Sequence, residues 1–166
     1  DTAPRLTVTE DWSWRVRFAP TQIGTWQYRV MATGGGKTVE SAWFTFEAMP
    51  SDNPGFVRVD KRNPRYFAFD DGTPYFPVGQ NVAWGGEKAP LADYRVWLDE
   101  MQGANANFVR VWMAPWGFAL EWQDTGLGNY DKRQHRAREL DVLLEMLSVR
   151  DIYMMLTLIN HGQFSV

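Results

Sequence analysis

Apolar and polar residues alternate with a period of two through roughly the first fifty positions of the chain. The stretches "WSWRVRF" (12–18), "TWQYRV" (25–30) and "ESAWFTFEA" (40–48) show this alternation. Turn-forming residues separate them at 20–24 and at 34–36. Strands with one buried face have this pattern, so we expect an antiparallel sheet that forms part of a β-sandwich.

The pattern changes from about residue 76. Two segments, 90–103 and 132–151, carry apolar residues three or four positions apart, which predicts helices. The predicted helix stripes are Tyr94, Trp97, Leu98 and Met101 in the first segment and Leu140, Leu143, Leu144 and Leu147 in the second. Three apolar runs, 75–84, 107–113 and 152–159, predict strands. Apolar strands that alternate with helices predict a parallel sheet covered by helices.

A short segment separates these two patterns. Residues 49–55, "MPSDNPG", combine prolines, a glycine and small polar side chains, which predicts a linker. Beyond it, Asp71-Gly72 predicts a tight turn between two short strands. We therefore expect a β domain over residues 1–52 and an α/β domain over residues 53–166.

Composition excludes several classes of function. The net charge of −3 provides no basic surface for nucleic acid or a membrane, and no apolar run approaches the ~18 residues of a membrane span. The chain has no cysteine and only two histidines, so we expect no metal and no cofactor. The Gly36-Lys37-Thr38 step lacks the glycine spacing and the following helix of a phosphate-binding loop. Because residue 1 is not a methionine, the start is processed or cut, and the compartment stays unknown.

Polar or aromatic residues follow each predicted strand of the α/β part at its carboxyl end. In parallel α/β folds ligands bind at that edge. The residues are Gln80, Asn81 and Trp84 after the first strand, Trp112, Trp116, Glu121 and Trp122 after the second, and Asn160, His161 and Gln163 after the third. His161 alone is more typical of a structural hydrogen bond, but its place beside Asn160 favours a role in a site. His135 lies on a charged helix face and is interpreted as solvated surface.

Arg110 lies in the middle of the second strand of this part. The alternation places Phe108, Arg110 and Trp112 on one face and leaves Val109 and Val111 to face the helices. A buried guanidinium needs a partner, because an unpaired buried charge is very costly. We expect a site arginine that faces carboxylates missing from this chain. The alternative is that Arg110 reaches solvent at a sheet edge or pairs with Asp70, Asp71 or Glu121.

The nine tryptophans divide between core and site. Trp112, Trp116 and Trp122 fall in a connection too long and too aromatic for an ordinary loop, so we expect them to contact a ligand. Trp97 completes a helix stripe and is interpreted as core. The four in the β part, Trp12, Trp14, Trp26 and Trp43, are interpreted mostly as packing.

Two stretches resemble known families. "WRVRFAPTQIGTWQYRV" resembles the Ig-like module, domain of unknown function 5060, that precedes many bacterial glycoside hydrolases. "GFVRVDKRNPRYFAFDDGTPYFPVGQNVAW" is similar to the entry of a cellulase-like, family 5-like (β/α)8 barrel of glycoside hydrolase clan A. "NFVRVWMAPW" and "IYMMLTLINHG" look like its second and third strands. The resemblance implies a multidomain β plus α/β chain: a partial Ig-like antiparallel β-sandwich, then the first three βα units of a TIM barrel.

The resemblance also implies roles for individual residues. Arg110 corresponds to the arginine that supports the nucleophilic carboxylate, Asn160-His161 to part of the sugar-binding floor, and Asn81 and Trp84 to the pocket lining. The two catalytic glutamates of the family follow strands four and seven, so we expect them beyond residue 166. The acidic residues of this region, Glu87, Glu121 and Asp124, match neither position. Retaining hydrolysis needs two carboxylates ~5–5.5 Å apart, so this chain alone is predicted to be inactive.

These observations lead to an expected function and its rivals. We expect part of a bacterial glycoside hydrolase that acts on a polysaccharide or oligosaccharide, secreted or periplasmic if the resemblance holds. The alternatives are a non-catalytic carbohydrate-binding protein and a protein-interaction module. A nucleotide or phosphate enzyme is a distant third, because no glycine-rich fingerprint follows a strand. A barrel of this type takes eight strands and ~250 residues. We therefore expect both ends to be cut, and a homo-oligomer or partner to cover the open edges of strands one and three.

Overall fold

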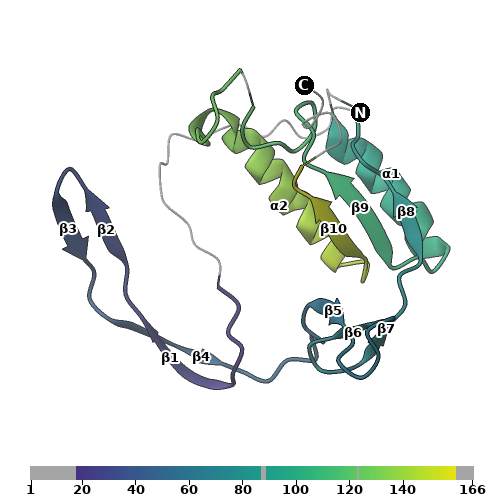
Figure 1. Ribbon diagram of the computed structural model, residues 1–166, viewed down its shortest axis with the longest axis horizontal. Helices are drawn as coiled ribbons and strands as arrows, with labels where there is room; N and C mark the ends of the chain where they lie inside the picture. Colours follow the sequence, from purple (N-terminus) through teal and green to yellow (C-terminus); the bar gives the residue numbers. More distant parts are fainter. Residues whose placement is uncertain (1–17, 87–88, 123, 160–166) are drawn as a thin grey trace. The chain divides into compact units, whose positions relative to one another are not determined.

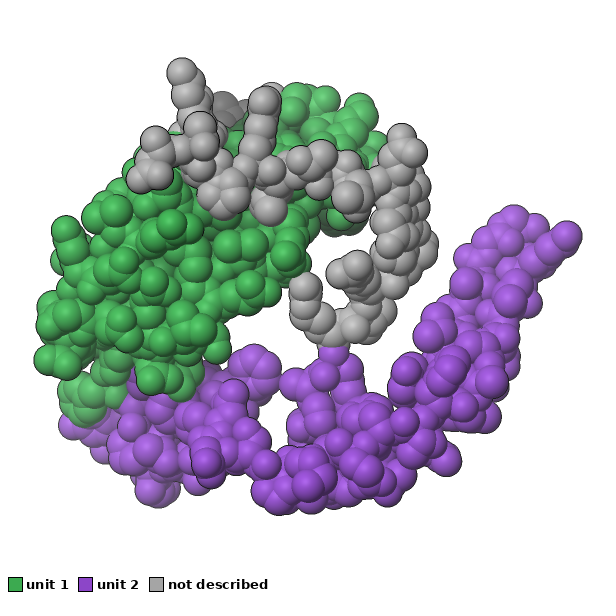
Figure 2. All heavy atoms as spheres, turned by 180° about the vertical axis from the view of Figure 1, so that it is seen from behind, with its two compact units in different colours: residues 1–10, 76–166 green, residues 11–75 purple. Residues whose placement is uncertain are grey.

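The computed structural model describes residues 18–86, 89–122 and 124–159 (Figure 1). This part of the chain falls into two compact units, which divide between Tyr75 and Phe76 (Figure 2). In chain order, the first unit, which ends at Tyr75 and is purple in Figure 2, holds seven short strands, and the second, which starts at Phe76 and is green there, holds three strands and two α-helices. The domain boundary predicted at residues 52 and 53 stays a prediction.

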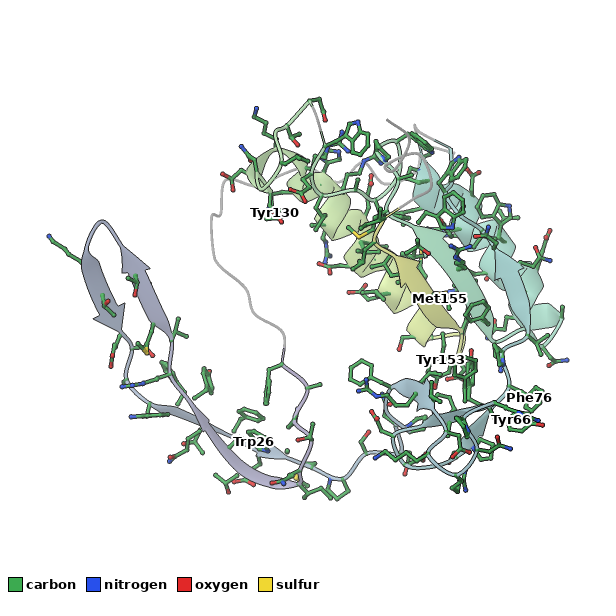
Figure 3. All side chains as sticks on the ribbon, viewed as in Figure 1. Trp26, Tyr66, Phe76, Tyr130, Tyr153 and Met155 are labelled. Carbon is green, nitrogen blue, oxygen red and sulfur yellow. The ribbon has the colours of Figure 1, made fainter. Side chains whose placement is uncertain are left out.

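Two antiparallel ladders form the start of the first unit. Strand β1 (Gly24–Tyr28) pairs with β4 (Phe44–Ala48), and β2 (Met31–Gly34) pairs with β3 (Lys37–Glu40). The β1–β4 register places Trp26, labelled in Figure 3, opposite Phe46. The antiparallel pairing predicted from the alternation is therefore present. A second sheet packed on these ladders stays a prediction, and Trp12 and Trp14 lie outside the described residues.

A three-stranded antiparallel sheet completes the first unit. It contains β5 (Val57–Val59), β6 (Phe67–Phe69) and β7 (Pro74–Tyr75), in that order. The turn between β6 and β7 is closed by a hydrogen bond from the Gly72 N–H to the Phe69 carbonyl, 2.9 Å long. Gly72 has a φ of 88°, a conformation that suits glycine. The tight turn predicted at Asp71-Gly72 is confirmed.

The second unit is built on a parallel sheet. Its strands are β8 (Gly79–Asn81), β9 (Phe108–Trp112) and β10 (Tyr153–Thr157), and they lie side by side with β9 in the middle (Figure 1). Helix α1 (Pro90–Gly103) joins β8 to β9. A 3-10 turn, η1 (Asp131–Arg133), and helix α2 (Gln134–Ser148) lead from β9 to β10. The predicted alternation of parallel strands and helices is confirmed.

Both helices contribute to one apolar core against β9. Its fully buried side chains are Tyr94 and Leu98 from α1, Val109 and Val111 from β9, Leu143 from α2, and Phe118 from the loop after β9. Val109 and Val111 therefore point to the helix side, as predicted. Trp97 packs against the core, partly buried. The stripe predicted for α2 was wrong at Leu144, which is 47% exposed, because the buried arc runs through Leu143 and Leu147.

Within the described residues, no helix is both long enough and apolar enough to cross a membrane.

Candidate functional site

The face of the parallel sheet that points away from the helices carries Arg110. The register sets Arg110 between Asn81 on β8 and Met155 on β10. Met155, labelled with Tyr153 in Figure 3, is 51% exposed. Because side chains alternate along a strand, these residues share the face opposite to the one that carries Val109 and Val111. Asn81 and Arg110 were predicted separately as site residues. They are thus direct neighbours on the adjacent strands β8 and β9.

The Arg110 guanidinium is held within the sheet by two contacts. Its Nε donates a hydrogen bond of 3.1 Å to the Thr157 hydroxyl, and its Cζ lies 5.3 Å from the centre of the Trp112 ring. The cation–π geometry is favourable at this distance. The side chain is half-buried. Neither of these contacts with described residues uses a hydrogen bond from the terminal guanidinium nitrogens.

The acidic residues weighed as partners for Arg110 are engaged elsewhere. The Asp70 carboxylate accepts the Phe56 N–H at 2.8 Å and the Arg58 Nε at 3.0 Å. The hydrogen bond from Phe56 is the main reason, and the one from Arg58 the second, that the pKa of the Asp70 carboxyl lies below its ordinary value. Asp71 accepts the Thr73 N–H, and Glu121 accepts the Gly128 N–H. In the part of the chain that the structure describes, Glu121 forms no ion pair with Arg110, and Asp70 and Asp71 belong to the other unit.

Three tryptophans gather where β8 and β9 end. The Trp84 ring lies 5.5 Å from the Trp112 ring at 58°, and 5.3 Å from the Trp116 ring at 85°. Trp84 and Trp116 are 39% and 38% exposed, so each offers part of its ring to solvent. Edge-to-face contacts of this kind stabilise aromatic clusters. We call these three residues the tryptophan cluster.

Local contacts fix the position of Trp84. The backbone N–H of Trp112 donates to the Ala83 carbonyl at 2.8 Å, which continues the contact between β8 and β9 up to the residue before Trp84. The Tyr94 hydroxyl donates to the Val82 carbonyl at 2.7 Å, and burial raises the pKa of Tyr94 well above its ordinary value. Gly85 follows Trp84 and approaches α1 so closely that a Cβ there would lie 2.7 Å from the Pro90 carbonyl oxygen.

Arg133 holds the loop that carries Trp116. Its Nη1 donates to the Pro115 carbonyl at 2.7 Å and to the Ala119 carbonyl at 3.3 Å, so it brackets the turn around Trp116. Its Nη2 forms an ion pair of 2.8 Å with Asp124. The Arg133 guanidinium holds the pKa of the Asp124 carboxyl below its ordinary value. The loop around the tryptophan cluster is thus ordered by one arginine from η1.

The other predicted site residues have different outcomes. The backbone N–H of Trp122 donates to the Thr125 hydroxyl at 3.0 Å and closes a turn. Among the described residues, Trp122 makes no ring contact with the tryptophan cluster. Asn160 and His161 lie outside the described residues. The described residues contain no group of three or more His, Cys, Asp or Glu that could hold a metal ion.

Sequence reasoning missed two residues. Thr157 accepts the Arg110 hydrogen bond, and its signal was a polar residue within an apolar strand run. Arg133 looked like one of several charged residues at the start of a surface helix. Its contacts with backbone carbonyls have no sequence signature.

No family model and no curated protein matches the chain. Solved structures do match. One is a protein from Bacteroides vulgatus ATCC 8482, proposed to be a glycoside hydrolase, with 22% identity and a TM-score of 0.56 over 84% of this chain and 30% of that chain. Another, described as a glycoside hydrolase, has 15% identity and a TM-score of 0.43 over 62% of this chain and 25% of that one. A family 5 glycoside hydrolase from Bacteroides vulgatus ATCC 8482 has 18% identity and a TM-score of 0.40 over 62% and 24%.

The first of these likenesses supports a glycoside hydrolase-like fold for the chain. The other two have TM-scores too low to add to this conclusion. The chain spans about 30% of the length of the first matching structure.

Proposed function

We propose that the chain is part of a glycoside hydrolase of the (β/α)8-barrel type and that the tryptophan cluster binds a polysaccharide or oligosaccharide. In this proposal β8, β9 and β10 are the first three barrel strands, β1 to β4 belong to an Ig-like module over residues 1–52, and β5 to β7 belong to the barrel part that starts at residue 53. One observation carries the proposal: Trp84, Trp112 and Trp116 meet at the carboxyl end of parallel strands, beside Arg110. Ligands of parallel α/β folds bind at that end.

The chemistry of the cluster suits a sugar. The C–H face of a sugar ring is apolar, whereas its hydroxyls need hydrogen-bond partners. Trp84 and Trp116 offer exposed aromatic surface at an angle of 85°, and the Asn81 amide and the Arg110 guanidinium supply donors on the neighbouring sheet face. Such a combination of aromatic walls and a few fixed polar groups is typical of small-molecule sites.

Hydrolysis itself is assigned to residues beyond this chain. A retaining glycosidase uses one carboxylic acid to protonate the leaving oxygen and one carboxylate to attack the anomeric carbon. Of the nearby acidic residues, Glu121 accepts the Gly128 N–H and Asp124 is paired with Arg133, so both serve the loop. We propose that Arg110, fixed by Thr157, supports a carboxylate from a later strand.

Sugar binding by the 166-residue chain tests the proposal. Calorimetric titration with neutral oligosaccharides should give saturable binding that Trp116→Ala weakens at least about tenfold, equivalent to about 1.4 kcal/mol. Trp43→Ala is the matched control, because Trp43 is 62% exposed and lies in the other unit. The absence of saturable binding, or an equal loss in both variants, would contradict the proposal. The chain should release no reducing sugar.

A second candidate is a protein-interaction module. Met155 and Phe76, both labelled in Figure 3, are 51% and 67% exposed and belong to the unit with the parallel sheet. Each of these side chains offers apolar surface that a partner protein could cover. If Trp116→Ala changes the sedimentation coefficient of the chain and leaves sugar titrations flat, this second candidate replaces the first.

A further inference from the structure

A pocket lies next to the tryptophan cluster along the chain, in the loop after β9 and the start of α2. It is an open hollow of about 300 Å³ and is lined by Pro115, Asp124, Thr125, Lys132, Arg133, His135 and Arg136. Ligand pockets start at roughly this volume. Pro115 directly precedes Trp116, so the pocket and the cluster share one turn of the loop.

The charges in this pocket do not cancel. Arg133 is paired with Asp124 at 2.8 Å, and Arg136 is paired with Glu139 at 2.8 Å. Lys132 forms no ion pair with any described residue and is exposed, as is its neighbour His135. Counting the described residues, the lining therefore carries one ammonium group without an ion-pair partner beside two guanidinium groups that are only partly exposed. An anion entering the pocket would gain the attraction of Lys132 without breaking either ion pair.

The pocket is also structurally fixed. The three hydrogen bonds of Arg133 to Pro115, Ala119 and Asp124 hold its walls together. Thr125 is buried, and its hydroxyl is hydrogen-bonded to both the backbone N–H and the carbonyl of Trp122, which fixes this part of the lining. A site built this way presents its cations without first ordering a loop, which lowers the entropic cost of binding.

We propose that this pocket is an anionic subsite: it binds the carboxylate or sulfate ester of a charged sugar in a chain whose neighbouring ring contacts Trp116. The inference rests on the proposed function and narrows its substrate class to acidic glycans. Lys132 is the specificity-determining residue. Arg133 has a structural role, and Arg136 contributes through the outer part of its guanidinium.

Matched oligosaccharides test this inference with the full chain. The same backbone is used in three forms: neutral, with one uronic acid residue, and with one sulfate ester. We expect at least one acidic form to bind at least fivefold tighter than the neutral form at low salt. Raising the ionic strength to about 0.5 M should reduce this preference, because salt screens exposed charges. The two acidic forms distinguish a carboxylate site from a sulfate site.

Variants of Lys132 make the test specific. Lys132→Gln should remove the preference for the acidic forms and leave neutral binding unchanged, and Lys132→Glu should reverse the preference. Lys37→Gln is the control, since Lys37 is an exposed lysine in the β2–β3 hairpin of the other unit. Neutral binding that is sensitive to Trp116→Ala, with no acidic preference, would overturn this inference and leave the proposed function standing. No binding of any form would overturn both.

Discussion

The backbones of Gly79 and Phe108 lie so close together that a Cβ on Gly79 would be 1.7 Å from the Phe108 carbonyl oxygen. The two residues face each other in the β8–β9 register. Gly79→Ala should therefore force the strands apart and lower the free energy of unfolding by about 1–3 kcal/mol or more. Urea denaturation followed by circular dichroism measures the change. Gln80→Ala on the same strand is the control, and an equal effect of both would argue against the close approach.

The hydrogen bond between Arg110 and Thr157 should have a measurable energy. Thr157→Val keeps the shape of the side chain but removes the acceptor, which should cost about 1.5–3 kcal/mol for a bond to a charged group. Thr157→Ser keeps the hydroxyl and should retain most of the bond. Nuclear magnetic resonance of the Arg110 Nε–H gives a direct reading: its exchange with solvent should accelerate in the valine variant alone.

Helix α1 is tied to the end of α2 by Asp99 and Arg150. The Arg150 Nη2 lies 2.7 Å from Asp99 Oδ1, and its Nη1 donates to the Met146 carbonyl at 2.7 Å. Because Asp99 is more than half exposed, Asp99→Asn should cost less than about 1 kcal/mol. Arg150→Met should cost more, since it also removes the donor to Met146. A double-mutant cycle by chemical denaturation separates the two contributions.

Acid should loosen the loop that carries Trp116. The pKa of Asp124 is lowered by Arg133, so its contribution to stability is complete above its ordinary pKa of 3.8 and is lost as the pH falls through the lowered value. Tryptophan fluorescence of the native protein should change in that range, below about pH 4. Asp124→Asn should show the loosened state already at neutral pH and little further change on acidification. A wild-type signal that is flat down to this range would contradict the prediction.

Tyr94 should resist ionisation in alkaline solution. Burial raises its pKa, so the contribution of the neutral phenol to stability is complete below its ordinary pKa of 10.0 and falls as the pH rises above that value. Tyrosinate absorbance of the folded protein, compared with that of the Tyr94→Phe variant, should show that Tyr94 stays neutral at its ordinary pKa. Tyr94→Phe should lower the free energy of unfolding by about 1 kcal/mol through loss of the bond to Val82.

Periodicity predicted the elements of the second unit because burial itself is periodic. Val109 and Val111 alternate with Arg110 in the sequence, and the structure buries the two valines and leaves Arg110 on the other face. The same reasoning failed at Leu144, where the partner elements cover a narrower arc of α2 than the leucines occupy. The spacing of apolar residues in one helix does not show how much of its surface the neighbouring elements will cover.

The site was only partly predictable for a related reason. Trp84, Trp112 and Trp116 could each be singled out, but their mutual contacts depend on how β8 and β9 pair. Trp122 has similar sequence surroundings and does not join them. The contacts of Arg133 with two carbonyls also depend on a loop path that no spacing encodes. The sequence was enough to select candidate residues by type, whereas the residues that they contact became known only from the fold.

The hairpin of β2 and β3 has a practical consequence. Every residue of both strands is exposed, and Gly35 and Gly36 turn between them with φ values of 55° and 75°. Since no core packing depends on its tip, an affinity peptide or a fluorescent label inserted between the two glycines should leave both folded units intact. The hairpin thus offers an attachment point for immobilising the chain or reporting on it, well suited to the sugar titrations.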